Sequence, residues 1–404
     1  ALSLPGAACR ARRGRASGSP RGRRTAMTLD ESLPGVGHMR ARARRRMPRV
    51  AWEYLDSGTG EGEGVHRNRR AMQEVRLVPR FFREALEPEL STTLWGRRRP
   101  LPFGVAPVGV QSLMWPGAEL ALARAARRAG VPYTLSTMAG EVLEKAAAGA
   151  GESFWFQLYV PRSEEILEDL IARAEAAGAE VLAVTLDVPM GSRRERQRRA
   201  GVGMPPKITP ALVLDVLSRP AWAFATLNRG IPTVATMAKY VPAGRLANFA
   251  AFVNAEMTVA VTPELLARIR ERWKGRLVVK GIVHPDDARA ALDMGCDGVW
   301  ASNHGARQLD SIPGGIATLP AIVEAVGGRA PVIYDSGVQD GHDVARALAL
   351  GADFVMLGRS FVYGVAAAGK PGAEHVMKVL TAELSNVMTQ LGCNRLSELK
   401  ERLA

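Results

Sequence analysis

His304 and Arg307 lie three residues apart at the end of a short apolar run. An imidazole can take a proton from a substrate near neutral pH. A guanidinium can hold a carboxylate through two parallel hydrogen bonds, which a lysine cannot reproduce. Taken alone, each has an ordinary alternative, a structural histidine or an arginine in a solvated loop. Their spacing favours a catalytic pair that acts on a small carboxylic acid.

Polar residues also close three other apolar runs, where a buried strand would stay apolar. These endings are Gln157-Leu158-Tyr159, Thr185-Leu186-Asp187 and Lys280-Gly281. Asp187 can orient His304 and stabilise its charged form. Lys280 would be costly as an unpaired buried charge, so we expect it to face an anion. Four polar strand ends favour one shared site over four separate buried groups.

Two glycine-containing turns near the C-terminus have the composition of a phosphate site. They read Asp335-Ser336-Gly337-Val338 and Leu357-Gly358-Arg359-Ser360. The backbone N–H groups of such turns bind phosphate, together with the start of a following helix. Each turn alone is a weak signal, but together they predict a phosphorylated cofactor or substrate.

The elements that position these residues repeat one rhythm from about residue 100, an apolar run followed by an amphipathic stretch of helix length. We expect strands at residues 101–109, 131–137, 153–160, 180–189, 276–281, 298–305, 330–337 and 353–358. Eight parallel βα units close most simply into a barrel with its catalytic groups at the carboxyl ends of the strands. The sequence therefore predicts an α/β protein, a (β/α)8 TIM barrel.

Two segments depart from this rhythm. Residues 48–80 precede the first strand and predict an N-terminal helical cap, which contributes Tyr54. Residues 190–262 form an insertion after the fourth strand that mixes arginines with aromatic residues, and a loop of that length needs a reason. A lid or lining of the active site is the favoured interpretation. Contact with a membrane surface, or simple packing of the aromatic side chains over the barrel, are the alternatives.

The charge of the chain is concentrated at its start. The net charge is +14, and residues 1–50 hold 13 basic and 2 acidic residues, so the remainder carries only +3. We interpret residues 1–38 as a basic, disordered extension and residues 39–404 as the barrel domain. The nearly neutral body gives no support for nucleic-acid binding. Three scattered cysteines predict neither a disulfide framework nor a metal site and favour a reducing compartment.

In these residues the chain resembles the FMN-dependent α-hydroxy-acid dehydrogenase and oxidase family, which includes glycolate oxidase, bacterial L-lactate dehydrogenase and mandelate dehydrogenase. The resemblance runs from about residue 48 to the C-terminus. It is carried by Ser302-Asn303-His304-Gly305-Ala306-Arg307-Gln308-Leu309-Asp310, Phe156-Gln157-Leu158-Tyr159, Leu135-Ser136-Thr137 and Val278-Val279-Lys280-Gly281. It implies that the chain oxidises an L-2-hydroxy acid, lactate-like or mandelate-like, to the 2-oxo acid.

The resemblance also implies a role for each site residue. His304 would be the active-site base and Asp187 its partner. The residues implied to contact the substrate are Tyr54, Tyr159, Arg194 and Arg307, the two arginines through its carboxylate. The residues implied to bind FMN are Pro107, Val108, Gly109, Ser136, Gln157, Thr185, Lys280, Ser302, Asp335, Gly337, Gly358 and Arg359. Gln339 stands where the family usually has an arginine, which predicts a weaker hold on the FMN phosphate.

The sequence leaves the electron acceptor open. A quinone would make use of the basic, aromatic insertion and would place a cytoplasmic enzyme peripherally at the inner membrane face. Molecular oxygen would instead make the chain an oxidase that releases hydrogen peroxide. A flavin-dependent barrel isomerase and a flavin-binding protein without turnover are more distant alternatives. By analogy with relatives, a homotetramer is expected.

Overall fold

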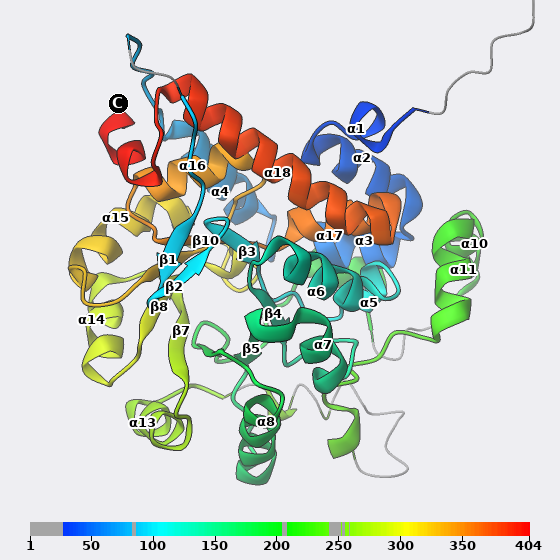
Figure 1. The fold of residues 1–404 in the computed structure, drawn as a ribbon. Helices are drawn as coiled ribbons and strands as arrows, with labels where there is room; N and C mark the ends of the chain where they lie inside the picture. The colour runs from blue at the N-terminus through cyan, green and yellow to red at the C-terminus, as the bar shows by residue number, and fades with distance from the viewer. Residues whose placement is uncertain (1–26, 83–85, 204–207, 242–251, 253–254, 258) are drawn as a thin grey trace, which may run out of the picture.

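Eight parallel strands close into a barrel in the computed structural model, which describes residues 27–82, 86–203, 208–241, 252, 255–257 and 259–404 (Figure 1). The strands are β3 (Phe103–Val105), β4 (Tyr133–Ser136), β5 (Phe154–Leu158), β6 (Val181–Thr185), β7 (Arg276–Ile282), β8 (Gly298–Ala301), β9 (Val332–Tyr334) and β10 (Phe354–Leu357). They are paired in chain order, and β10 closes the ring onto β3. Each coincides with one predicted range, so the predicted fold is confirmed.

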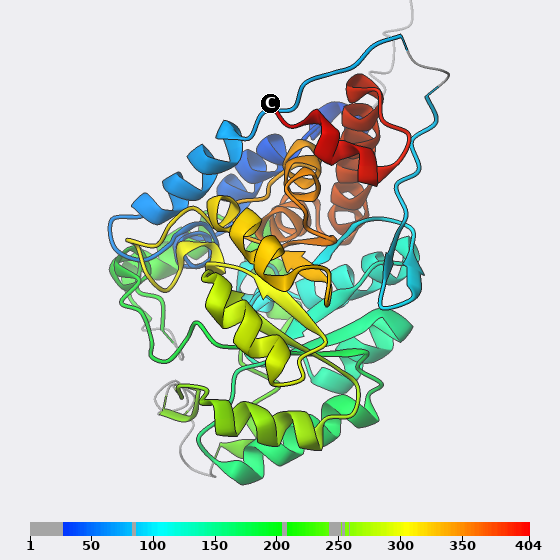
Figure 2. The same ribbon diagram turned by 90° about the vertical axis from the view of Figure 1, so that its left-hand side faces the viewer.

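Helices form the outer layer of the barrel (Figure 2). Those in the βα units are α5 (Gln111–Met114), α6 (Ala118–Ala129), α7 (Leu143–Ala150), α8 (Glu164–Ala176), α13 (Pro263–Arg272), α14 (Pro285–Asp293), α15 (Gly315–Val326), α16 (Gly341–Ala349), α17 (Arg359–Ala368) and α18 (Lys370–Leu391). Their starts follow capping chemistry. Pro285 occupies the first turn of α14, and the side chain of Asp340 accepts from the N–H of Asp343 at the start of α16.

A helical cap precedes the barrel, as predicted. Its helices are α1 (Leu29–Ser32), α2 (Val36–Arg46), α3 (Arg49–Asp56) and α4 (Glu63–Glu74). Helix α1 and the start of α2 lie within the predicted extension of residues 1–38, so this described part of it is helical and not disordered. Val36, Met39 and Ala43 recur at helical spacing and are all buried, which fixes α2 against the barrel helix α17. Residues 1–26 of the predicted extension lie outside the described residues.

A short antiparallel hairpin before the barrel was not predicted. It pairs β1 (Thr92–Leu94) with β2 (Arg97–Arg99). Trp95 and Gly96 turn the chain with φ of +49° and +78°. Leu94 and Trp95 pack on the side chains inside the barrel, among them Trp155, and so help to close one end of it. Each strand has only three residues, and all three residues of β2 are arginines, so the sequence shows no alternation of apolar and polar residues that would predict the hairpin.

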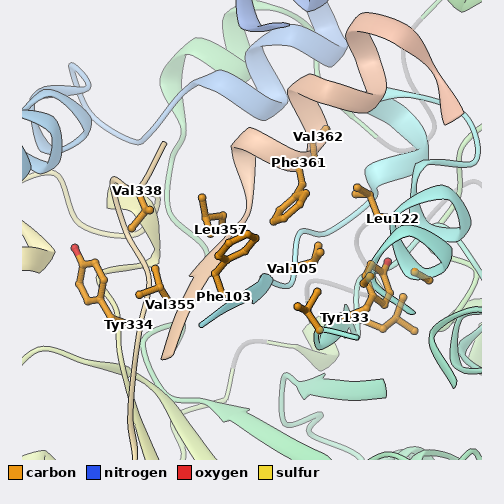
Figure 3. Close-up of a cluster of buried hydrophobic side chains, with 14 of the residues drawn as sticks. Phe103, Val105, Leu122, Tyr133, Tyr334, Val338, Val355, Leu357, Phe361 and Val362 are labelled. Atoms are coloured by element: carbon orange, nitrogen blue, oxygen red, sulfur yellow. The ribbon is translucent and has the colours of Figure 1, made fainter. Parts of the chain in front are cut away.

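The core has two layers. Trp155, Trp300, Phe354 and Met356 fill the inside of the barrel. The second layer lies between the strands and the helices. Figure 3 shows part of this layer, with Phe103, Val105, Leu122, Tyr133, Tyr334, Val338, Val355, Leu357, Phe361 and Val362 labelled. This packed scaffold holds the strand ends, and therefore the site, in fixed positions.

The predicted insertion connects β6 to α13. Its described helices are α9 (Glu195–Arg199), α10 (Pro210–Leu217), α11 (Pro220–Arg229) and the short 3-10 helix η2 (Ala238–Tyr240). Residues 204–207, 242–251, 253–254 and 258 of the insertion lie outside the described residues. Across the described part of the chain, no helix combines the length and the apolar character needed to cross a membrane.

Candidate active site

His304 lies after β8, between Asp187 from the loop after β6 and Tyr159 from the loop after β5. Its Nδ1 is 2.9 Å from Asp187 Oδ1, and its Nε2 is 3.2 Å from the Tyr159 hydroxyl oxygen. A carboxylate at Nδ1 favours the tautomer that carries its proton there. Nε2 is then left as an acceptor. The structure thus brings the three predicted residues together in one hydrogen-bonded group.

Burial and neighbouring charges determine the protonation states of His304 and Tyr159. Burial lowers the pKa of His304 below its ordinary value; Asp187 raises it, while Lys280 and Arg194 lower it further. The imidazole is therefore neutral near pH 7 and can accept a proton. Burial and the charge of Asp187 raise the pKa of Tyr159, so its hydroxyl keeps its proton and can donate a hydrogen bond.

The backbone at His304 adopts an uncommon left-handed conformation. The φ angles are +55° at His304, +61° at Gly305 and +58° at Ala306. For a residue with a side chain this costs about 1 kcal/mol or more and persists only where neighbours enforce it. Asn303 supplies part of that restraint, because its amide exchanges two hydrogen bonds with the amide of Asn68 on α4, at 2.6 and 3.0 Å. The helical cap therefore helps to aim the imidazole.

Arg307 and Arg194 approach the cavity from separate loops. Nη1 of Arg307 donates to the carbonyl oxygens of Tyr54 at 2.8 Å and Ser57 at 3.3 Å, and its Cζ lies 5.2 Å from the Tyr54 ring centroid. The hydroxyl of Ser192 donates to the Arg307 carbonyl oxygen at 2.7 Å and accepts from Arg194 Nε at 3.1 Å. The two arginines are thus linked through one serine.

These two guanidinium groups are not neutralised by the protein. In the described ranges, no carboxylate lies within ion-pair distance of Arg307 or Arg194. Burial, and next the charge of Arg194, lower the pKa of Arg307 to about 9. A buried cation is costly unless an anion completes its surroundings. The arrangement therefore fits an anionic ligand.

A hydrogen-bonded chain of side chains joins the ends of β4, β5 and β6. Ser136 Oγ accepts from the Met138 N–H at 3.1 Å and donates to Gln157 Oε1 at 2.9 Å. Gln157 Nε2 then donates to Thr185 Oγ1, also at 2.9 Å. All three side chains are buried. These hydrogen bonds hold in place the loop that brings Met138 to the cavity.

Lys280 is paired within the protein. Its Nζ is 2.8 Å from Asp335 Oδ2 and 2.7 Å from Ser302 Oγ. Burial raises the pKa of Asp335, but Lys280 and the Ser302 and Ser336 hydroxyls outweigh it, so this carboxyl stays ionised. The anion expected at Lys280 is thus supplied first by Asp335. The pattern of polar residues at strand ends could not by itself indicate that Asp335 is the partner of Lys280.

The two glycine turns lie together at the other end of the cavity. Gly337 has φ of +82°, and a Cβ there would come within 3.2 Å of Asn68 atoms, so only glycine fits. Gly358 is the N-cap residue of α17, and no side chain caps that helix, so its first N–H groups have no side-chain partner. The Arg359 guanidinium donates to the carbonyl oxygens of Leu55, Ser57 and Gly305.

Most of the predicted residues line one cavity of about 530 Å³. Those that line it are Tyr54, Pro107, Val108, Gly109, Tyr159, Arg194, Lys280, His304, Arg307, Asp335, Gly337, Gly358 and Arg359. The others support it from behind through the hydrogen bonds described above, and they are Ser136, Gln157, Thr185, Asp187 and Ser302. None of the predicted residues lies away from the site.

Several lining residues were not predicted. Asn68 and Arg69 come from α4, and Ser192, Val234 and Met257 come from the insertion. None of them stands at a strand end, where a polar residue in an apolar run draws attention to itself. A single sequence holds no other local signal that would mark them. The insertion does line the cavity, as the favoured interpretation of it required.

The family follows from comparison with known proteins. Residues 43–404 match the model of a family described as FMN-dependent dehydrogenase. The chain belongs to this family. An L-lactate dehydrogenase of Caulobacter vibrioides (strain NA1000 / CB15N) is 38% identical over 368 residues, which cover 90% of this chain and 95% of that enzyme. An L-lactate dehydrogenase of Xanthomonas euvesicatoria pv. vesicatoria (strain 85-10) is 36% identical over 370 residues, 91% of this chain and 95% of that enzyme.

Solved structures also resemble this chain closely. A (S)-mandelate dehydrogenase, described as a monotopic membrane protein, superposes with a TM-score of 0.87 and 33% identity over 92% of this chain and 99% of that one. A mandelate oxidase superposes with a TM-score of 0.79 and 35% identity over 92% and 98%. The cavity fits FMN, because a glycine cradle and the uncapped start of α17 can receive a phosphate at one end.

Proposed function

We propose that the chain oxidises an L-2-hydroxy acid to the corresponding 2-oxo acid. The observation that carries this proposal is the placement of two half-buried, unneutralised arginines, Arg307 and Arg194, beside a neutral histidine that is hydrogen-bonded to a carboxylate. The curated relatives are named L-lactate dehydrogenases, and the structural neighbours are named for mandelate. Both substrates are 2-hydroxy acids, so chemistry and relatives point to one class.

In this mechanism the protein binds and orients the substrate and takes one proton from it. Arg307 and Arg194 hold the carboxylate, which supplies the missing counter-ion. Nε2 of His304 accepts a proton, and Asp187 stabilises the imidazolium that results. Tyr159 donates a hydrogen bond to the substrate oxygen, and Tyr54 lies beside Arg307 at the same wall.

FMN, when bound, supplies the two-electron acceptor for this oxidation. The residues proposed to hold it are Pro107, Val108, Gly109, Ser136, Gln157, Thr185, Lys280, Ser302, Asp335, Gly337, Gly358 and Arg359. Lys280 would supply a positive charge to the bound flavin, and Asp335 fixes that ammonium group in place. The glycine turns and the first N–H groups of α17 would hold the phosphate.

We further propose a quinone as the electron acceptor, with the enzyme in peripheral contact with a membrane. Two observations support this: the superposed mandelate dehydrogenase is a monotopic membrane protein, and the insertion of this chain exposes apolar side chains. Molecular oxygen is the second candidate, because a mandelate oxidase superposes almost as well. Stopped-flow reoxidation of the reduced enzyme by oxygen and by a quinone analogue separates the two. Faster reoxidation by oxygen would overturn the quinone proposal.

The reaction itself is tested by anaerobic mixing of the FMN-loaded enzyme with a panel of L- and D-2-hydroxy acids. We expect the visible flavin absorbance to bleach with L-lactate, L-mandelate or a close analogue and to stay with the D forms. A flavin that no member of the panel bleaches would contradict the proposal. Such silence would favour a flavin-dependent isomerase or a flavin-binding protein without turnover.

A further inference from the structure

A buried carboxyl group lies between two segments that border the cavity. Glu119 stands in the first turn of α6 and is only 1% exposed. Its Oε1 accepts from the backbone N–H of Ser112 at 2.9 Å and from that of Gly140 at 3.0 Å. Ser112 belongs to α5, which follows β3, and Gly140 follows β4. One oxygen atom therefore joins the segments that leave two neighbouring strands.

The two joined segments carry residues that line the cavity. Val108 lies shortly before Ser112, and Met138 lies shortly before Gly140. A second link runs beside the carboxyl group, because the Val110 N–H donates to the Met138 carbonyl oxygen at 2.7 Å. The segments also approach closely, since a Cβ on Gly140 would come within 1.8 Å of Ser112 Oγ. A shift of either segment would therefore move this wall of the cavity.

Hydrogen bonds, and no cation, compensate the Glu119 carboxyl group. Among the residues that the structure describes, no lysine, arginine or histidine lies within ion-pair distance of it, and the charge of Glu141 acts against its ionisation. Burial raises the pKa of Glu119 to about 7, although its backbone hydrogen bonds lower it. A carboxyl group buried in this way is costly unless hydrogen bonds satisfy it. Oε1 can accept from both N–H groups with or without a proton on the carboxyl group, so the bridge persists through neutral pH.

We propose that Glu119 is a positioning residue of the active site, which holds the segment after β3 against the segment after β4 and so shapes the cavity wall between Val108 and Met138. This inference rests on the proposed function, because that function places the segment after β3 beside FMN. Glu119 does not itself line the cavity, and it acts through the two backbone N–H groups that it binds. A carboxyl group that only stabilised the fold would not alter the bound flavin.

The test compares Glu119→Leu with Glu119→Gln in the full chain loaded with FMN. Leucine leaves two buried N–H groups without their acceptor, whereas glutamine keeps an oxygen atom that can accept from them. We expect Glu119→Leu to weaken FMN binding by about 5-fold or more, measured by fluorescence quenching, and to change the visible circular dichroism of the bound flavin. Glu119→Gln should restore most of the affinity and most of the dichroism.

The matched control is Asp353→Leu. The Asp353 carboxylate also accepts from a backbone N–H, that of Val332 at 2.8 Å, but at the start of β9 and therefore away from the site. Asp353→Leu and Glu119→Leu should both lower the unfolding temperature, and only Glu119→Leu should change the flavin. Gly140→Ala is a second perturbation, because it keeps the carboxyl group but forces the segment of Gly140 away from Ser112. It should change the flavin dichroism as Glu119→Leu does.

Unchanged FMN affinity and dichroism in Glu119→Leu would overturn the proposal. Equal changes of the flavin in Glu119→Leu and Asp353→Leu would also overturn it, because Glu119 would then act only on general stability. If Glu119→Leu does not fold, Gly140→Ala decides, since an altered flavin dichroism supports the proposal and an unaltered one overturns it. None of these measurements needs turnover, so a chain that binds FMN but oxidises no hydroxy acid would contradict the proposed reaction alone.

Discussion

Arg307→Lys is the sharpest perturbation of the substrate site, because it keeps a positive charge and removes the guanidinium geometry. In the structure Arg307 is stacked on Tyr54 at 5.2 Å and is held by two backbone carbonyl oxygens at 2.8 and 3.3 Å. The lysine loses this placement and one of the two hydrogen bonds to the substrate carboxylate. A hydrogen bond to a charged group contributes about 1.5–3 kcal/mol. We therefore expect kcat/KM to fall by roughly 10- to 150-fold.

The assay is anaerobic flavin reduction followed by stopped flow, with the hydroxy acid and its uncharged amide as paired substrates. In the unmodified enzyme, kcat/KM should be much lower for the amide than for the acid. In Arg307→Lys this difference in kcat/KM between the two substrates should be smaller. FMN affinity, measured by fluorescence quenching, should not change. Arg70→Lys, in an exposed pair with Glu63, is the matched control and should behave as the unmodified enzyme. If Arg307→Lys kept kcat/KM within about twofold, the carboxylate clamp would be refuted.

Three further outcomes follow from the same geometry. As the pH falls below the ordinary histidine pKa near 6.5, kcat/KM should stay high until the pH reaches the lowered pKa of His304, and should then decline, because only the neutral imidazole accepts a proton. A decline of kcat/KM that starts above pH 7 would contradict this. Asp187→Asn removes the group that raises that pKa, so the acidic limb should shift to lower pH while kcat drops by about 100-fold or more; an unshifted limb would separate Asp187 from His304. Gln339→Arg should tighten FMN binding several-fold without tightening riboflavin, as measured by fluorescence quenching; equal effects on both ligands would place residue 339 away from the phosphate.

The strand ends were predictable because their signal is local. A polar residue that closes an apolar run identifies itself in the sequence, and in this way His304, Asp187 and Lys280 could be assigned to one rim. Their partners across the barrel could not be assigned so directly. The pairing of Lys280 with Asp335 joins positions 55 residues apart, and Asn68 reaches Asn303 from a helix outside the barrel.

The orientation of the helices in the insertion could not be predicted from the sequence either. Its apolar residues on α10 and α11 are visible in the sequence, but hydrophobic periodicity does not say whether an apolar face is buried or exposed. Only the contacts of Asp215 and Arg219 with the cap show that the polar side faces inward. Helix α2 was not predicted for a related reason, since its five arginines hid the buried stripe of Val36, Met39 and Ala43.

The proposed reaction requires His304 to accept the substrate proton in the FMN-loaded enzyme. Its most direct test is His304→Gln, loaded with FMN and mixed anaerobically with the best 2-hydroxy acid of the panel. We expect the variant to hold FMN as firmly as the unmodified enzyme and its flavin absorbance to persist, with reduction slowed by at least about 100-fold. Bleaching at the full rate would show that the proton is taken by another group.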